Sequence, residues 1–279
     1  MLVFAKNKSV QQKINSLEKN ISVGFVATMG ALHQGHLSLV EHAKRENDIV
    51  VVSIFVNPTQ FDKQEDLVNY PKTIVSDLNL LQSTGCDIVY MPAAEEVYEN
   101  NVISRVFDFD GLEHQMEGKF RVGHFDGVGT IVKRLFEIIR PTRAYFGEKD
   151  FQQLQIIRKM VEKEQIPVEI IGCDIYREAD GLAMSSRNTR LTKEHRNSAP
   201  FIYNILKEVK VKFGTENVTN ILQWVENEFK KEPLLELEYF EIATENTLLP
   251  ITDHNKTQKY RAFIAVFAGN IRLIDNISL

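Results

Sequence analysis

Two hydrophobic periodicities alternate along the first part of the chain. Short apolar runs, typical of β-strands, cover residues 23–27, 49–56, 88–91, 144–146 and 168–171. Apolar residues at helical spacing lie between these runs, over residues 37–45, 74–81, 128–139 and 150–163. Because strands and helices alternate, we expect an α/β fold with a Rossmann-like, doubly wound parallel sheet.

The pattern changes beyond Arg177. Two helical stretches are predicted first, over residues 194–211 and 218–229, and strands follow at 237–243, 261–267 and 271–274. The sequence Ala268-Gly269-Asn270 predicts a hairpin turn between the last two strands. Helices followed by antiparallel strands indicate a smaller C-terminal α+β domain. We therefore expect one domain over residues 1–174 and a second over residues 175–279.

A segment with two histidines stands where a predicted strand gives way to a predicted helix. Its sequence is Thr28-Met29-Gly30-Ala31-Leu32-His33-Gln34-Gly35-His36. A helix start presents backbone N–H groups and partial positive charge, which favour phosphate, and His33 and His36 share one face of a helical turn. The segment therefore indicates nucleotide phosphates held by backbone and imidazole groups. A zinc site is one alternative, although a third ligand is missing, and two solvated histidines are the other.

Polar clusters also follow three other predicted strands, at the edge where doubly wound sheets bind ligands. They are Asn57-Pro58-Thr59-Gln60-Phe61, Gly147-Glu148-Lys149-Asp150 and the loop 177–188, which contains Met184-Ser185-Ser186-Arg187. The amides of Asn57 and Gln60 suit an uncharged substrate with hydroxyl groups, whereas Lys149 and Arg187 suit phosphate. Taken singly, the clusters also fit a plain turn, an exposed lysine beside a cap and a surface loop.

Two more features belong with these clusters. Gln153 lies one turn into the helix after Lys149, where it faces the same predicted pocket. Arg121 and His124 precede the clearest amphipathic helix and are further candidates, while Asp126 equally fits a helix cap.

The composition of the chain bears on the classes of partner that it is expected to bind. A net charge of −5 favours neither nucleic acid nor an anionic membrane surface. Cys86 and Cys173 fit no metal or redox spacing, and we expect two reduced, buried thiols in a cytoplasmic protein. We expect no secretory signal, and the longest apolar run, at 49–56, is too short to span a bilayer.

Taken together, these motifs closely resemble those of the pantoate–β-alanine ligase (pantothenate synthetase) family of the nucleotidylyltransferase superfamily. The resemblance rests on residues 28–36, 55–61, 121–128, 147–150, 153, 177–188 and 272–276, and so extends over the whole chain. It implies ATP-dependent condensation in two steps. Pantoate first reacts with ATP to give pantoyl adenylate and pyrophosphate, and β-alanine then displaces AMP. It also implies Mg²⁺, a cytoplasmic homodimer, a nucleotide- and pantoate-binding first domain and a second domain that acts as a lid.

The resemblance also assigns site residues by position. Those assigned to ATP are Met29, Gly30, Ala31, Leu32, His33, Gln34, Gly35, His36, Gly147, Glu148, Lys149, Asp150, Tyr176, Met184, Ser185, Ser186 and Arg187. Gln60 and Gln153 are assigned to pantoate, Gln60 also to β-alanine, and we add Thr28 and Asn57 to the substrate-binding set. His36 matches the family's proposed proton donor, and His33, Lys149 and Arg187 complete the predicted catalytic set. Tyr176 departs from the small aliphatic residue usual there. The metal ligands stay open, with Asp77 and Asp150 as candidates.

Two other functions compete with this hypothesis. A nucleotidyltransferase that moves AMP onto a phosphate would keep the histidine motif, but it would need basic groups for its acceptor. The amides of Asn57, Gln60 and Gln153 favour an uncharged polyol instead. A catalytically dead nucleotide sensor is disfavoured because His36, Lys149 and Arg187 are all present.

Overall fold

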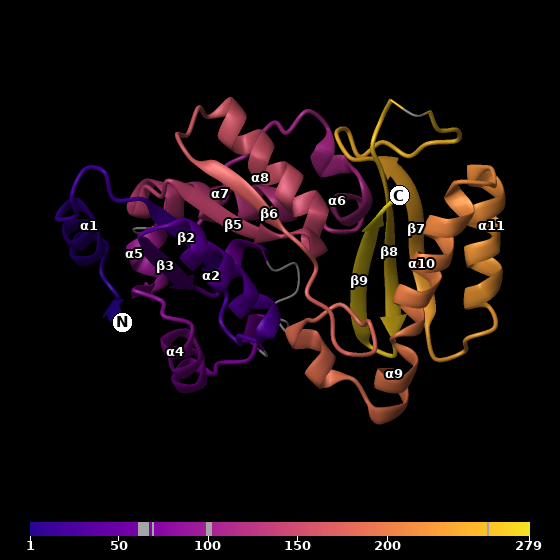
Figure 1. Cartoon of the computed structure of the whole chain (residues 1–279), viewed down its shortest axis with the longest axis horizontal. Helices are drawn as coiled ribbons and strands as arrows, with labels where there is room; N and C mark the ends of the chain where they lie inside the picture. The colour runs from indigo at the N-terminus through magenta and orange to yellow at the C-terminus, as the bar shows by residue number, and fades with distance from the viewer. Residues whose placement is uncertain (61–66, 69, 99–101, 256) are drawn as a thin grey trace. The chain divides into compact units, whose positions relative to one another are not determined.

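The computed structural model describes residues 1–60, 67–68, 70–98, 102–255 and 257–279 (Figure 1). Phe61, the last residue of the predicted Asn57–Phe61 cluster, therefore lies outside the described residues. Contacts divide the chain into two compact units. The first comprises residues 1–113, 117–148 and 153–174, and the second comprises residues 114–116, 149–152 and 175–279.

A six-stranded, all-parallel sheet forms the centre of the first unit. Its strands are β1 (Leu2–Phe4), β2 (Val23–Thr28), β3 (Ile49–Ile54), β4 (Ile88–Tyr90), β5 (Arg143–Gly147) and β6 (Glu169–Cys173). Their order across the sheet is β1-β4-β3-β2-β5-β6. The chain thus runs outward from β2 in one direction and then resumes on its other side at β5. This reversal is the switch point beside which doubly wound sheets bind ligands, and the expected α/β fold class is confirmed.

Helices connect the strands of this unit. They are α1 (Asn7–Asn15), α2 (Gln34–Glu46), α4 (Ile74–Ser83), α5 (Ala94–Tyr98), α6 (Met116–Phe120), α7 (His124–Ile139) and α8 (Phe151–Lys163), of which α6 and α8 begin in the second unit. Leu37, Val40 and Ala43 of α2 are buried in one apolar cluster with Val26 of β2 and with Val50 and Val52 of β3. Burial of this face is the main reason that α2 is stable, because isolated helices of its length are marginal in water. Helix α4 ends at Ser83, and Gly85 follows it with a φ of 73°, a backbone conformation that glycine adopts readily after a helix end.

Two elements at the N-terminus were not predicted. Strand β1 has three residues, of which Leu2 and Val3 are 47% and 50% exposed, so it has no pattern of alternating burial. Helix α1 buries only Val10. Three residues are too few to show the period of a strand, and α1 has only two apolar residues, Val10 and Ile14, so neither element gives a clear pattern in the sequence.

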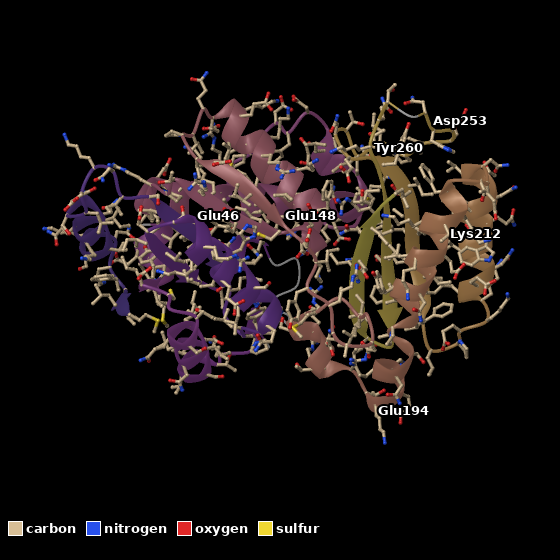
Figure 2. The ribbon with its side chains drawn as sticks, in the orientation of Figure 1. Glu46, Glu148, Glu194, Lys212, Asp253 and Tyr260 are labelled. Atoms are coloured by element: carbon tan, nitrogen blue, oxygen red, sulfur yellow. The ribbon has the colours of Figure 1, made fainter. Side chains whose placement is uncertain are left out.

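The second unit contains a three-stranded antiparallel sheet in the order β7-β8-β9. Its strands are β7 (Glu236–Thr244), β8 (Tyr260–Ala268) and β9 (Ile271–Ser278), and its helices are α9 (Lys193–Ser198), α10 (Phe201–Phe213) and α11 (Val218–Phe229). Helices α10 and α11 lie along this sheet and share its apolar core (Figure 1). Figure 2 labels Tyr260, where β8 begins.

One predicted element of this unit is divided. The helical stretch expected over residues 194–211 is two helices, α9 and α10, which are separated at Ala199 and Pro200. Ala199 and Pro200 both keep helical φ and ψ values, but Pro200 has no backbone N–H to donate to the preceding turn, so the helical hydrogen bonding is interrupted there. The predicted hairpin between β8 and β9 is confirmed, with Gly269 at a φ of 59°. Among the described residues, no helix combines the length and the apolar character needed to cross a membrane.

Candidate active site

One buried carboxylate holds the turn between β2 and α2. Asp77, in the first turn of α4 and 1% exposed, accepts hydrogen bonds from the N–H groups of Ala31 (3.0 Å) and Leu32 (2.9 Å). The Thr73 hydroxyl donates to the same carboxylate at 3.1 Å. Gly30 and Ala31 have φ values of 84° and 51°, a region that is unfavourable for alanine. Asp77 therefore stabilises a strained turn, and it occupies two of the N–H groups that were predicted to bind phosphate.

The two histidines meet at the start of α2. His33 is the N-cap residue in extended conformation, and its backbone N–H donates to Nδ1 of His36 at 3.4 Å. The backbone N–H of His36 donates to the His33 carbonyl at 2.8 Å, and the ring centroids are 4.0 Å apart. Because Nδ1 of His36 accepts a hydrogen bond, the neutral ring carries its proton on Nε2. His36 is thus prepared to donate a hydrogen bond from Nε2.

The substrate-binding set predicted after β3 forms one polar network. Asn57 is 1% exposed, and its amide group donates to Oε1 of Gln60 at 3.1 Å and to the Gly127 carbonyl at 3.3 Å. The amide of Gln60 donates in turn to the sulfur of Met29 at 3.1 Å. The hydroxyl groups of Thr59 and Tyr98 donate to Oδ1 of Asn57. The hydrogen bonds of Asn57 are therefore satisfied inside the protein, and the geometry makes it a support for Gln60.

Arg121 and the first residue of helix α7, His124, hold the backbone of Gln60. The side chains of Arg121 and His124 both contact the Gln60 carbonyl, at 3.2 and 3.0 Å, and contact each other at 3.1 Å. A Cβ atom at Gly127 would stand 2.4 Å from the Thr59 carbonyl oxygen, so only glycine permits this approach of α7 to the turn Pro58–Gln60. Arg121 and His124 thus lie beside a predicted substrate residue, and their own functional role stays a prediction.

Other predicted residues of this unit lie near strand ends. The Thr28 hydroxyl donates to the Ser53 carbonyl at 2.8 Å and accepts from the N–H of Gly30 at 3.2 Å, so its assignment to substrate stays a prediction. Gly147 ends β5 and Glu148 follows it (Figure 2). Gln153 is half-buried on α8.

The remaining predicted residues belong to the second unit. Lys149, Ser185 and Arg187 line one small pocket there. The other lining residues are Leu182, Ala183, Asn188, Ile202, Arg272, Leu273, Ile274 and Asp275. The Ser185 hydroxyl caps the short helix Ser186–Arg190 by accepting from the N–H of Arg187 at 3.3 Å. The structure therefore brings together the cations that the sequence assigned to phosphate within this unit.

A hairpin-like loop carries these residues. The Tyr176 carbonyl accepts from the N–H of Met184 at 3.0 Å, which closes the loop, and the Tyr176 side chain is 41% exposed. Arg177 forms a two-point ion pair with Asp275 of β9, at 2.7 and 3.0 Å. Burial raises the pKa of Asp275 above the usual range, and the guanidinium of Arg177 acts in the opposite direction. The pair anchors the loop to β9.

Some residues that position the predicted site residues were not predicted in that role from the sequence. Tyr98 and the positioning role of Asp77 are examples, since both act on residues tens of positions away. One signal was present for Asp77, because Asp77 and Leu81 are one turn apart and are the buried residues of α4. A carboxylate on the buried face of a helix needs hydrogen-bond donors, which here are the N–H groups of the turn.

Known proteins similar to this chain agree with the geometry. A family model described as Pantoate-beta-alanine ligase matches residues 2–278. The pantothenate synthetase of Flavobacterium psychrophilum is 56% identical over 100% of both chains. That of Christiangramia forsetii is 54% identical over 100% of this chain and 99% of its own.

Solved structures extend the comparison to the fold. The pantothenate synthetase of Thermus thermophilus has a TM-score of 0.92 and 41% identity, with 99% of both chains covered. The pantoate-beta-alanine ligase of Francisella tularensis, complexed with beta-gamma ATP and beta-alanine, has a TM-score of 0.83 and 35% identity, with 100% of this chain and 97% of its own covered. The match over nearly the full length, with the histidine pair and the amide network in place, shows that the chain belongs to the pantoate–β-alanine ligase family.

Proposed function

We propose that this enzyme condenses pantoate with β-alanine through a pantoyl adenylate. The observation that carries the adenylate step is the histidine pair, because His36 is held with a donor at Nε2 at the start of a helix. In the first step, a pantoate carboxylate oxygen attacks the α-phosphorus of ATP, and the bond to pyrophosphate breaks. In the second, the β-alanine amine attacks the acyl carbon, AMP leaves with the electron pair of the broken bond, and the amine loses a proton.

Fixed hydrogen-bond donors account for acceleration of the first step. Negative charge grows on the phosphate oxygens as pyrophosphate leaves, and donors that are already oriented stabilise that state more than the ground state. In this proposal the side chains of His33, His36, Lys149 and Arg187 bind ATP. Gln60 holds pantoate, because its amide is oriented by Asn57 and its carbonyl by His124.

Magnesium fits as an ion that enters with ATP. Among the described residues, no group of three or more His, Cys, Asp or Glu side chains could hold a metal ion. Mg²⁺ usually keeps several waters and binds through phosphates and one or two carboxylates, so a protein cage is not required. Asp150, whose side chain is 49% exposed, is the better carboxylate candidate, since Asp77 serves the turn. Bound Mg²⁺ would neutralise phosphate charge.

Oligomeric state and compartment complete the proposal. We propose a cytoplasmic homodimer, as the resemblance to the family implies. Cys86 and Cys173 are buried free thiols, which fits a reducing compartment. Burial raises the pKa of each thiol to about 12, so both are inert at neutral pH. Sedimentation equilibrium tests the dimer.

The two-step reaction predicts a specific isotope exchange. Labelled pyrophosphate should enter ATP when the enzyme, Mg²⁺, ATP and pantoate are present without β-alanine. Without pantoate no label should appear. If exchange required β-alanine, the adenylate would not form as a separate intermediate, and the proposal would be wrong. Formation of AMP with the amide product is the matching measurement for the complete reaction.

Substitution of the two glutamines should separate pantoate binding from ATP binding. Gln60→Ala and Gln153→Ala should raise the KM for pantoate more than the KM for ATP. A buried substrate hydroxyl that loses its partner costs about 1–3 kcal/mol, or roughly 5- to 150-fold. Gln155→Ala is a matched control, because Gln155 lies on the same helix as Gln153 and contacts Arg158 at 3.2 Å. Equal effects on both KM values would contradict the assignment.

A further inference from the structure

Lys149 belongs to the C-terminal unit, although the residues just before it belong to the unit of the parallel sheet. Residues 149–152 group with the second unit, whereas Gly147 and Glu148 belong to the first. The backbone carbonyl of Lys149 accepts a hydrogen bond from the amide of Asn276 at 2.9 Å. Asn276 lies on β9 and is 2% exposed. A buried donor therefore acts directly on the residue that carries the predicted phosphate-binding charge.

The orientation of the Asn276 amide is fixed by Arg261. The guanidinium of Arg261, on β8, donates from Nη1 to Oδ1 of Asn276 at 2.6 Å. Since an arginine only donates, the amide must present its oxygen to Arg261 and its nitrogen to Lys149. Arg261 is itself 5% exposed and is paired with Glu245 at 2.9 Å. Few alternative orientations of the Asn276 side chain remain.

The same arginine also fixes the residues that follow Lys149. Its guanidinium stacks over the ring of Phe151, with 3.9 Å between Cζ and the ring centroid. Phe151 packs against Phe263 of β8 at a centroid distance of 6.0 Å. Contacts on both sides of Asp150 therefore attach this segment to the antiparallel sheet, one through the Lys149 carbonyl and one through the Phe151 ring.

We propose that Asn276, oriented by Arg261, is a positioning residue that sets Lys149 for the phosphates of ATP. Asp275, its neighbour on β9, lines the pocket that Lys149 and Arg187 also line. Strand β9 thus sets the spacing between the lysine and the phosphate loop. The inference rests on the proposed role of Lys149 and names the residues on which that role depends.

A double-mutant cycle tests the inference. Asn276→Asp keeps an oxygen for Arg261 but places a second oxygen against the Lys149 carbonyl. It should lower the rate of pantoate-dependent pyrophosphate exchange at least tenfold in the otherwise native enzyme. In the Lys149→Ala background the same change should alter the rate less than twofold, because the group it positions is gone. Asn276→Ala, which removes both contacts without adding a charge, is carried through the same cycle in case the first variant folds poorly.

A control substitution separates positioning from general damage. Asn217→Asp makes the same chemical change in the same unit, where only the side-chain oxygen is used, as the cap of α11. It should leave the exchange rate unchanged. If the rate losses caused by the Asn276 and Lys149 substitutions multiply in the double variant, Asn276 is merely structural and the inference is overturned. A native exchange rate in both Asn276 variants would also overturn it. A native rate in Lys149→Ala would instead overturn the proposed role of Lys149, and the inference with it.

Discussion

His36→Ala is expected to slow pyrophosphate exchange by about 10²–10³-fold, the usual cost of losing one oriented donor to a transition state. The reason is geometric, since the N–H of His33 contacts Nδ1 of His36 and leaves the proton on Nε2. Stability should change little, because the side chain lies at the start of α2 and is not one of the buried residues of that helix. Single-turnover exchange and thermal melting measure the two effects separately.

Two conservative variants locate the donor on the ring. Asparagine places an oxygen near the position of Nδ1, so His36→Asn keeps the contact with His33 and removes the donor at Nε2. Glutamine places its amide nitrogen near the position of Nε2, so His36→Gln should retain more activity. His42→Ala is the matched control, because His42 lies on the same helix, where it contacts Glu46 at 3.1 Å. It should leave exchange within about twofold, on the grounds that exposed pairs contribute little. A larger loss in His36→Gln than in His36→Asn would contradict this mechanism.

The parts of the fold that sequence predicted well are those with a regular apolar face. The strand before the histidine motif and the helix after it were predicted because their apolar positions repeat, and β2 and α2 contain the residues expected. The position of the histidine pair could be predicted as well, because it lies in the turn between that strand and the start of that helix. Such local patterns require no knowledge of distant residues.

The residues that support the site could not be predicted from such local patterns. The predicted last strand stopped at residue 274 because Asp275 and Asn276 are polar, yet β9 continues to Ser278. Both residues are buried because Arg177 and Arg261, far away in sequence, supply their partners. The attachment of Lys149 to the second unit has the same origin, since it depends on Asn276. A polar residue at the end of a predicted strand thus indicates a hydrogen-bond partner elsewhere in the chain, although the sequence alone does not identify that partner.

Asp77→Ala is expected to damage both stability and catalysis. Two backbone N–H groups, of Ala31 and Leu32, would lose their acceptor, and each buried donor without a partner costs about 1–3 kcal/mol. The strained turn at Ala31 would relax, and the histidine pair that follows it would lose its orientation. We expect a clear loss of unfolding free energy in urea and at least a tenfold fall in pyrophosphate exchange.

Asp77→Asn distinguishes this positioning role from a direct role as a Mg²⁺ ligand. The variant keeps one acceptor oxygen and turns an NH₂ group toward a backbone N–H, so stability should fall even when no nucleotide or metal is present. Excess Mg²⁺ should not restore exchange, because the defect lies in the turn. A metal ligand would behave in the opposite way, with native stability in the absence of ligands and an exchange rate that recovers as the Mg²⁺ concentration is raised.

Asp150→Asn is the companion variant. Among the described residues, the exposed Asp150 carboxylate forms an ion pair only with Lys149, at 3.6 Å. We expect an altered Mg²⁺ requirement in Asp150→Asn and a loss of stability only in Asp77→Asn. That result would make Asp150 the Mg²⁺ ligand and Asp77 the support of the turn. Recovery of Asp77→Asn by Mg²⁺ would instead make Asp77 the ligand.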